Sequence, residues 1–233
     1  MTKTVDFIPD RVFQVWNNRL KIEIEAANLF GRLGANMKIL WGANDPIAEL
    51  AFTAADEELR HAELCREILK LSPKPIQALS PEIKLHLGPR DLDLQDHVLY
   101  TSVALGCVTE TMSTALLLRM HQCADTGIFK DTIHEILQDE INHSRIGWAE
   151  LARYQQKRNL EWLLPHIQLM INDSLKTEIK PMTEIQPMKQ DLSSWGILPH
   201  EEAKRISMQT INEVLCPGLN QILNNPLKSE TNV

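Results

Sequence analysis

The sequence of 233 residues has few cysteines, few aromatic residues and no long apolar run. Its four cysteines are widely separated and form no Cys-x-x-Cys pair, which argues against a rubredoxin-type or zinc-ribbon metal site. No apolar run approaches the roughly 20 residues that cross a bilayer, and residues 1–6 lack the apolar stretch of a signal peptide. We therefore expect a cytoplasmic protein with reduced thiols and no membrane partner.

Basic residues are also too few to balance the acids. The chain has 24 lysines and arginines against 31 aspartates and glutamates, a formal net charge of -7. This charge argues against nucleic acid as a partner. Hydrophobic residues at 43% and charged residues at 24% are ordinary values, so we expect a globular protein with a substantial core.

Period-two alternation, which indicates β-strands, is nearly absent, and apolar residues instead recur at helical spacing. The pattern predicts long helices over residues 10–33, 45–69, 92–124 and 131–159, with Gly127 closing the third. Four prolines in residues 72–90 predict a long crossover between the second and third helices. Shorter helices are expected over 160–175, broken early by Pro165, and over 200–215, after a loop spanning 180–199. The sequence thus predicts an all-α protein, with a bundle over 10–159 and a C-terminal helical extension over 160–233.

Two of the long helices contain the same short motif, Glu-x-x-His, formed by Glu58 with His61 and by Glu140 with His143. Residues three apart lie on one face of a helix, so each motif presents a carboxylate and an imidazole together. About one such spacing is expected by chance in this sequence. Both motifs, however, lie on the apolar face of their helix, where acids and imidazoles are costly unless they are paired or bind metal.

The other two long helices each offer one inward carboxylate. At about 100° per residue, Glu23 shares a face with Trp16 and Leu20, whereas Glu25 points toward the polar face. Glu110 is the one acidic residue in the middle of the third helix, among apolar neighbours. We therefore choose Glu23 and Glu110 and leave Glu25 as surface.

Together these residues form a set of four carboxylates and two histidines from four helices. This is the ligand set of ferritin-like di-iron and di-manganese bundles. One metal is predicted to bind Glu23 and His61 and the other Glu110 and His143, with the two motif glutamates bridging. Carboxylate-rich sites suit iron or manganese better than zinc. The alternative is a metal-free bundle whose buried acids pair with basic side chains. The predicted metal ligands are Glu23, Glu58, His61, Glu110, Glu140 and His143.

Residues 55–65 and 106–112 resemble segments of bacterial ferritin-like domain proteins of unassigned activity, in the ferritin-like di-iron carboxylate superfamily. The resemblance covers roughly residues 10–154. It implies a ferritin-like four-helix bundle with two iron ions, or one manganese and one iron, that activate O₂. It further implies an oxidase or oxygenase that acts on a small organic substrate and receives electrons from an unidentified donor. A ferroxidase that binds or stores iron is the alternative.

Several nearby residues remain open as supporting groups. Glu57 and Glu150 are alternative ligands or neighbours of the site. Asp56, two residues before Glu58, and Asp139, directly before Glu140, are candidates for orienting the histidines. The residues beyond 159 would clutter a closed storage cage, so we expect them to cap the bundle or to form the interface of a homodimer.

Overall fold

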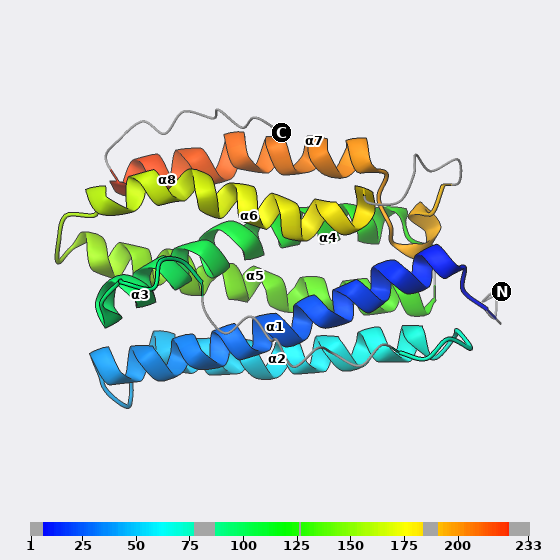
Figure 1. The fold of residues 1–233 in the computed structure, drawn as a ribbon, viewed down its shortest axis with the longest axis horizontal. Helices are drawn as coiled ribbons and strands as arrows, with labels where there is room; N and C mark the ends of the chain where they lie inside the picture. The colour runs from blue at the N-terminus through cyan, green and yellow to red at the C-terminus, as the bar shows by residue number, and fades with distance from the viewer. Residues whose placement is uncertain (1–6, 77–86, 126, 184–190, 224–233) are drawn as a thin grey trace.

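The structure is a computed structural model that describes residues 7–76, 87–125, 127–183 and 191–223, and within these ranges it is helical without any strand (Figure 1). The all-α prediction is confirmed. The α-helices are α1 (Asp10–Trp41), α2 (Pro46–Leu69), α3 (Leu94–Thr101), α4 (Thr111–Cys123), α5 (Ile128–Gln155), α6 (Leu164–Thr183), α7 (His200–Thr210) and α8 (Cys216–Leu223). Two π-helices, η1 (Ser102–Glu110) and η4 (Ile211–Leu215), and two 3₁₀ turns, η2 (Glu161–Leu163) and η3 (Ser193–Trp195), complete the described elements.

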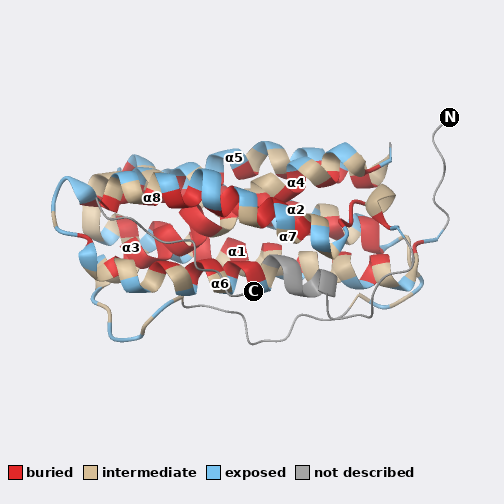
Figure 2. Cartoon of the chain, turned by 90° about the horizontal axis from the view of Figure 1, so that it is seen from above, coloured by how far each residue is buried: buried red, intermediate tan, exposed pale blue. Residues whose placement is uncertain are grey.

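Four long helical segments lie side by side along the long axis of the molecule (Figure 1). α1 and α2 form an antiparallel hairpin with extensive contact, and α2 also packs on α5. α3, η1 and α4 follow one another without a break and pack on α5. Buried residues line the faces that these helices turn toward one another (Figure 2). The interior between the four segments is where the predicted ligands lie.

The hairpin begins and ends where local signals place its helices, with one exception. The Asp45 carboxylate accepts hydrogen bonds from the backbone N–H groups of Ile47 and Ala48, and Pro46 is the first helical residue, as predicted. The prediction that α1 ends at residue 33 was wrong, because the helix continues through Gly34. A Cβ atom there would lie 3.1 Å from the carbonyl oxygen of Ala48, so this glycine allows α2 to approach closely instead of ending α1.

Three further helix limits differ from the predicted ones. Gly127, with φ of +126°, directly precedes α5 instead of closing the helix before it, which ends at Cys123. Pro165 is the second residue of α6, and Pro217 is the second residue of α8. Proline is tolerated in a first turn because its missing N–H has no partner there, so Pro165 does not break α6 as expected. The predicted crossover falls partly on residues 77–86, outside the described ranges.

The C-terminal helices form an additional layer. α6 packs on η1, α7 on α4 and α8 on α5. Figure 1 shows all three along the edge of the molecule opposite α2. This layer covers the outer side of the helix that supplies Glu110, and α6 contributes to the wall of a cavity beside it.

One helix is more apolar than the sequence analysis expected. The continuous segment Leu94–Cys123 is long and apolar enough to cross a membrane by length and composition. Of its most apolar stretch, however, 72% is buried inside the protein. A core helix of a soluble protein has the same character, so this segment is weak evidence for a membrane span.

Candidate metal centre

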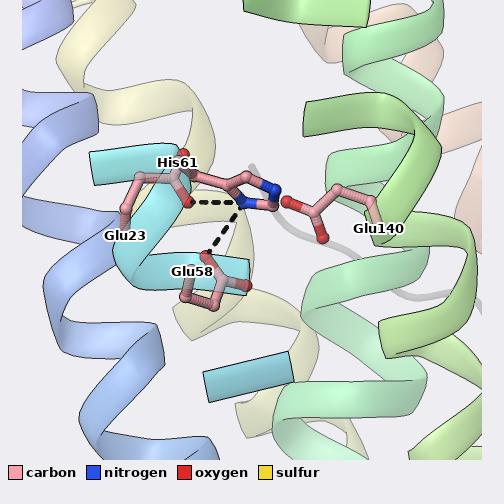
Figure 3. A group of neighbouring side chains, drawn as sticks. All are labelled: Glu23, Glu58, His61 and Glu140. Atoms are coloured by element: carbon pink, nitrogen blue, oxygen red, sulfur yellow. Dashed lines mark ion pairs between the residues drawn. The ribbon is translucent and has the colours of Figure 1, made fainter. Parts of the chain in front are cut away.

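The structure brings the six predicted residues together in the interior. They form two overlapping groups, and in each group the carboxylate and imidazole ligand atoms lie within 4.8 Å of one another. One group contains Glu23 and His61 and the other Glu110 and His143, and Glu58 and Glu140 belong to both. All six side chains are at most 3% exposed. Figure 3 shows one group, in which Glu23 and Glu58 approach the same nitrogen of His61, Nδ1, and Glu140 points toward them from α5.

The face of α1 that carries Glu23 is turned inward, as the sequence predicts. Glu23 is 1% exposed and belongs to the group, whereas Glu25 lies on the side of α1 nearer to solvent and pairs with Lys21 at 3.7 Å. Buried neighbours of Glu23 on α1 include Leu20 and Trp16, one and two turns earlier. The structure therefore separates the two glutamates as helical periodicity separates them.

Each histidine is held by an acid from the opposite motif helix. The Nε2 atom of His61 lies 2.9 Å from Oδ2 of Asp139, and Nε2 of His143 lies 2.9 Å from Oε2 of Glu57. Each acid directly precedes a motif glutamate, so the arrangement is reciprocal between α2 and α5. A carboxylate beside Nε2 keeps the proton on that nitrogen and leaves Nδ1 for the interior. The prediction for Asp139 agrees with this contact, but Asp56 is exposed and Glu57 takes the expected position.

Burial and close contact between acids and imidazoles shift the pKa values of the cluster. Burial raises the pKa of Glu58 to about 7, and the carboxylates of Glu140 and Glu23 add to the effect. Burial works against a protonated imidazole, but adjacent carboxylates outweigh it and raise the pKa of His61 to about 10 and that of His143 to about 11. In the absence of a metal ion, protons on the imidazoles thus supply positive charge to the cluster.

Arg19 is a member of this cluster that the sequence analysis missed. It lies one turn before Glu23 on α1, forms an ion pair with that residue and reaches Glu140 Oε1 at 3.4 Å and Ser113 Oγ at 3.3 Å. Although burial opposes ionisation, the Arg19 guanidinium holds the pKa of Glu23 well below its usual range. The signal was the i, i+4 spacing of Arg19 and Glu23 on one helix face. The alternative to a metal site was that the buried acids pair with basic side chains, and Glu23 with Arg19 is one such pair.

Even so, the pairing with Arg19 does not satisfy the cluster. Glu58 Oε2, His61 Nδ1, Glu140 Oε2 and His143 Nδ1 are buried and have no hydrogen-bond partner among the described residues. The nearest contacts of the two imidazole nitrogens are carboxylate oxygens of the same cluster, at 3.1–3.7 Å. Buried polar atoms without partners are costly. A bound cation would be coordinated by these carboxylate oxygens and imidazole nitrogens, which point toward one another. The cluster can therefore hold metal ions.

A very close contact between two helices fixes the second group. Gly106 on η1 faces Gly147 on α5, and a Cβ atom at Gly147 would lie 2.4 Å from the backbone nitrogen of Cys107. Glu110 is the last residue of η1, so this contact sets its distance from the motif on α5. Inside η1, the hydroxyl of Thr109 donates to the carbonyl of Ala104, five residues earlier, which is the spacing of a π-helix. Such segments often occur at functional sites.

Glu150, an alternative ligand in the sequence analysis, is buried but lies in neither group. Its Oε1 accepts a hydrogen bond of 2.7 Å from the indole N–H of Trp41, and its Oε2 lies 3.3 Å from Arg153. Arg153 also pairs with Asp45 at 2.8 Å. Glu150 therefore ties α5 to the α1–α2 hairpin near the loop between the two helices.

A cavity of about 110 Å³ borders the cluster. Four of the candidate ligands line it, together with Arg19. Apolar residues of α1, η1 and α6 form much of the remaining wall. A small molecule in this cavity would lie directly against the carboxylates.

Comparison of the chain with models of known protein families, with curated proteins and with solved structures found no match. The functional assignment therefore depends on the geometry and chemistry of the site.

Proposed function

We propose that this chain is a ferritin-like di-iron carboxylate protein that acts as an oxidase or oxygenase on a small organic substrate. The observation that supports the proposal best is the pair of buried ligand groups that share Glu58 and Glu140. Glu23 with His61, and Glu110 with His143, would each hold one iron ion, and the shared glutamates would bridge. Ferritin-like bundles use this donor set, and donors without thiolates suit iron or manganese.

The arrangement of helices is consistent with the same proposal. α1, α2, the α3–η1–α4 segment and α5 would be the four helices of the bundle, and the connection from α2 to α3 would be its long crossover. Each half of the chain would then contribute one helix with a single glutamate and one helix with Glu-x-x-His. The layer α6–α8 would be an addition to that bundle.

Bound ferrous ions would supply the electrons that reduce O₂, which side chains cannot supply on their own. The chain itself would contribute by positioning the ligands and by excluding water from the metal centre. Asp139 and Glu57 orient the two imidazoles so that Nδ1 faces the interior. Burial of the four glutamates keeps water from the centre, and the adjoining cavity limits the size of what can reach it.

The proposal is tested by metal titration of the protein after treatment with a chelator. Under anaerobic conditions, the wild type is expected to bind two ferrous ions per chain and to consume O₂ on exposure. Glu58→Ala and Glu140→Ala should each lose most of the metal, because each removes a ligand from both groups. Glu25→Ala is the matched control and should still bind two ferrous ions per chain.

Three results would count against the proposal. A wild type that binds no iron would refute it, and so would equal losses in Glu25→Ala and Glu58→Ala. Growth of an iron mineral, instead of a fixed stoichiometry, would support the alternative of iron storage. The cavity beside the cluster favours an organic substrate, because storage needs no largely apolar cavity next to the metal.

A further inference from the structure

Ser174 carries a buried hydroxyl group for which the proposed metal centre gives no role. This residue of α6 lines the cavity beside the cluster and is 4% exposed. Its Oγ atom has no hydrogen-bond partner among the described residues. A buried hydroxyl without a partner raises the free energy of the folded protein, and an acceptor atom of a ligand would remove that cost. The wall of the cavity therefore offers a hydrogen-bond donor to a bound molecule.

The other serine and threonine hydroxyls of the wall are already engaged. Thr109 and Thr177 each donate a hydrogen bond to a backbone carbonyl of their own helix, at 2.9 and 3.0 Å. Ser113 Oγ accepts a hydrogen bond of 3.3 Å from Arg19. A serine hydroxyl can turn about its Cα–Cβ bond. Ser174 can therefore direct its O–H at a molecule in the cavity without breaking an existing hydrogen bond.

The charged side chains of the wall, other than the candidate ligands, already have partners of opposite charge. These pairs are Glu25 with Lys21 at 3.7 Å, Asp173 with Lys176 at 3.2 Å, and Arg19 with Glu23. Tyr100 also lines the cavity, and its phenol stays neutral because burial and the nearby Asp173 carboxylate raise its pKa. A charged ligand would lose hydration here without gaining a new counter-charge from these groups, which is costly. The wall therefore favours an uncharged ligand.

Much of the remaining wall is apolar and sets the kind of molecule that fits. The apolar side chains belong to Ile22, Ala26, Leu29, Leu105 and Met170. An apolar cavity of about 150 Å³ accommodates benzene. The present cavity, at about 110 Å³, therefore suits an aliphatic body of about four to six carbons.

We propose that this cavity binds an uncharged aliphatic molecule with one acceptor oxygen, as in a small ketone, and that this oxygen accepts a hydrogen bond from Ser174. The apolar body would lie against the apolar wall. That this molecule is the substrate rests on the proposed function, because the same cavity adjoins the candidate metal ligands. Binding in the cavity does not itself require the metal ions, so it can be measured without them.

The test is calorimetry on the chelator-treated protein with 2-hexanone and with 2-methyl-1-hexene, in which a CH₂ group replaces the ketone oxygen. Ser174→Ala should weaken the binding of 2-hexanone by about 3–10-fold, the effect of one hydrogen bond, and should leave the alkene unaffected. Hexanoate and hexylamine, which carry a charge, should bind the wild type at least about tenfold more weakly than 2-hexanone.

Two further variants separate the role of Ser174 from a general effect of removing a buried hydroxyl. Ser207 on α7 is 1% exposed and its Oγ also lacks a partner among the described residues, but it does not line the cavity. Ser207→Ala is therefore the matched control and should leave the affinity for 2-hexanone unchanged. Ser174→Cys keeps the shape with a weaker donor and should bind the ketone with intermediate affinity. This variant gives a second measurement if the alanine variant does not fold.

Each contrary outcome has a distinct meaning. Unchanged affinity for 2-hexanone in Ser174→Ala would overturn the inference, as would equal losses for the ketone and the alkene, which would indicate an effect of shape. Tighter binding of hexylamine would assign recognition to the acids of the cluster and overturn it too. Metal uptake is measured separately. Loss of ketone affinity in Ser174→Ala in a protein that takes up no iron would refute the proposed function and support the ketone site, whereas two bound ions without an effect of Ser174 would refute the inference alone.

Discussion

Replacing Gly147 by alanine tests whether the contact between η1 and α5 holds the second ligand group in place. The new Cβ atom would lie 2.4 Å from Cys107 N and from Ser102 O, and neither backbone atom can rotate away. An ordinary contact of about 3.4 Å requires the two helices to separate by about 1 Å. Overpacking costs about 1–3 kcal/mol, and we expect the upper end here because both contacts are backbone.

Part of this cost is offset within the helix itself. Alanine is favoured over glycine in a helix interior by about 1 kcal/mol. The free energy of unfolding of Gly147→Ala should therefore fall by about 2 kcal/mol relative to the wild type. Metal uptake should fall as well, because Glu110 lies on one of the separating helices and Glu140 and His143 lie on the other.

Urea unfolding of the metal-free proteins, followed by circular dichroism, measures the change, and Gly31→Ala is the matched control. Gly31 is also helical, but the nearest atom to its added Cβ would be Ala55 Cβ at 3.8 Å, an ordinary contact. This variant should be stabilised by about 0.5–1 kcal/mol. The urea concentration at the unfolding midpoint should fall in Gly147→Ala and rise in Gly31→Ala. The dependence of the unfolding free energy on urea concentration should be similar in both. Similar midpoints in both variants would show that the backbones are not in the close contact described.

Two further predictions concern the histidine supports and alkaline stability. Asp139→Ala and Glu57→Ala should each weaken metal binding by about 10–100-fold in the iron titration. Asp56→Ala, at an exposed position, should not weaken it. Equal effects in all three variants would contradict the assigned contacts. Burial raises the pKa of the Tyr154 phenol, so the folded protein retains a proton that the unfolded chain loses above about pH 10. The free energy of unfolding is therefore expected to fall as pH rises above about 10, and to fall less steeply in Tyr154→Phe. Urea unfolding at a series of pH values measures both profiles. Parallel profiles for the two proteins would refute this reasoning.

The helix faces were predictable from the sequence because burial repeats every 3.6 residues, and this information is local. Glu23 was separated from Glu25 on this ground alone, and the structure agrees. Helix limits were less predictable. Gly34 looks like a stop signal but allows close packing of α2, and Pro217 lies in the first turn of α8, directly after the π-helix η4. In both cases the effect of the residue depends on its surroundings.

The contacts across helices could not be predicted in the same way. Arg19 and Glu140 are 121 positions apart, and His61 and Asp139 are 78 apart. Whether such residues meet depends on how far one helix is shifted along another, and a shift of one turn would replace every partner. The glycine pair Gly106 and Gly147 helps to set that shift, but only the packed structure shows that the two face each other.

The sequence by itself determined that the chain is helical and which side of each long helix carries its acids and histidines, because both follow from short-range periodicity. Tertiary structure alone decided that the acid before each motif supports the histidine of the other motif, and that a guanidinium lies among the candidate ligands. The physical reason is that these contacts depend on the relative positions of separate helices, which are fixed by packing over the whole interior.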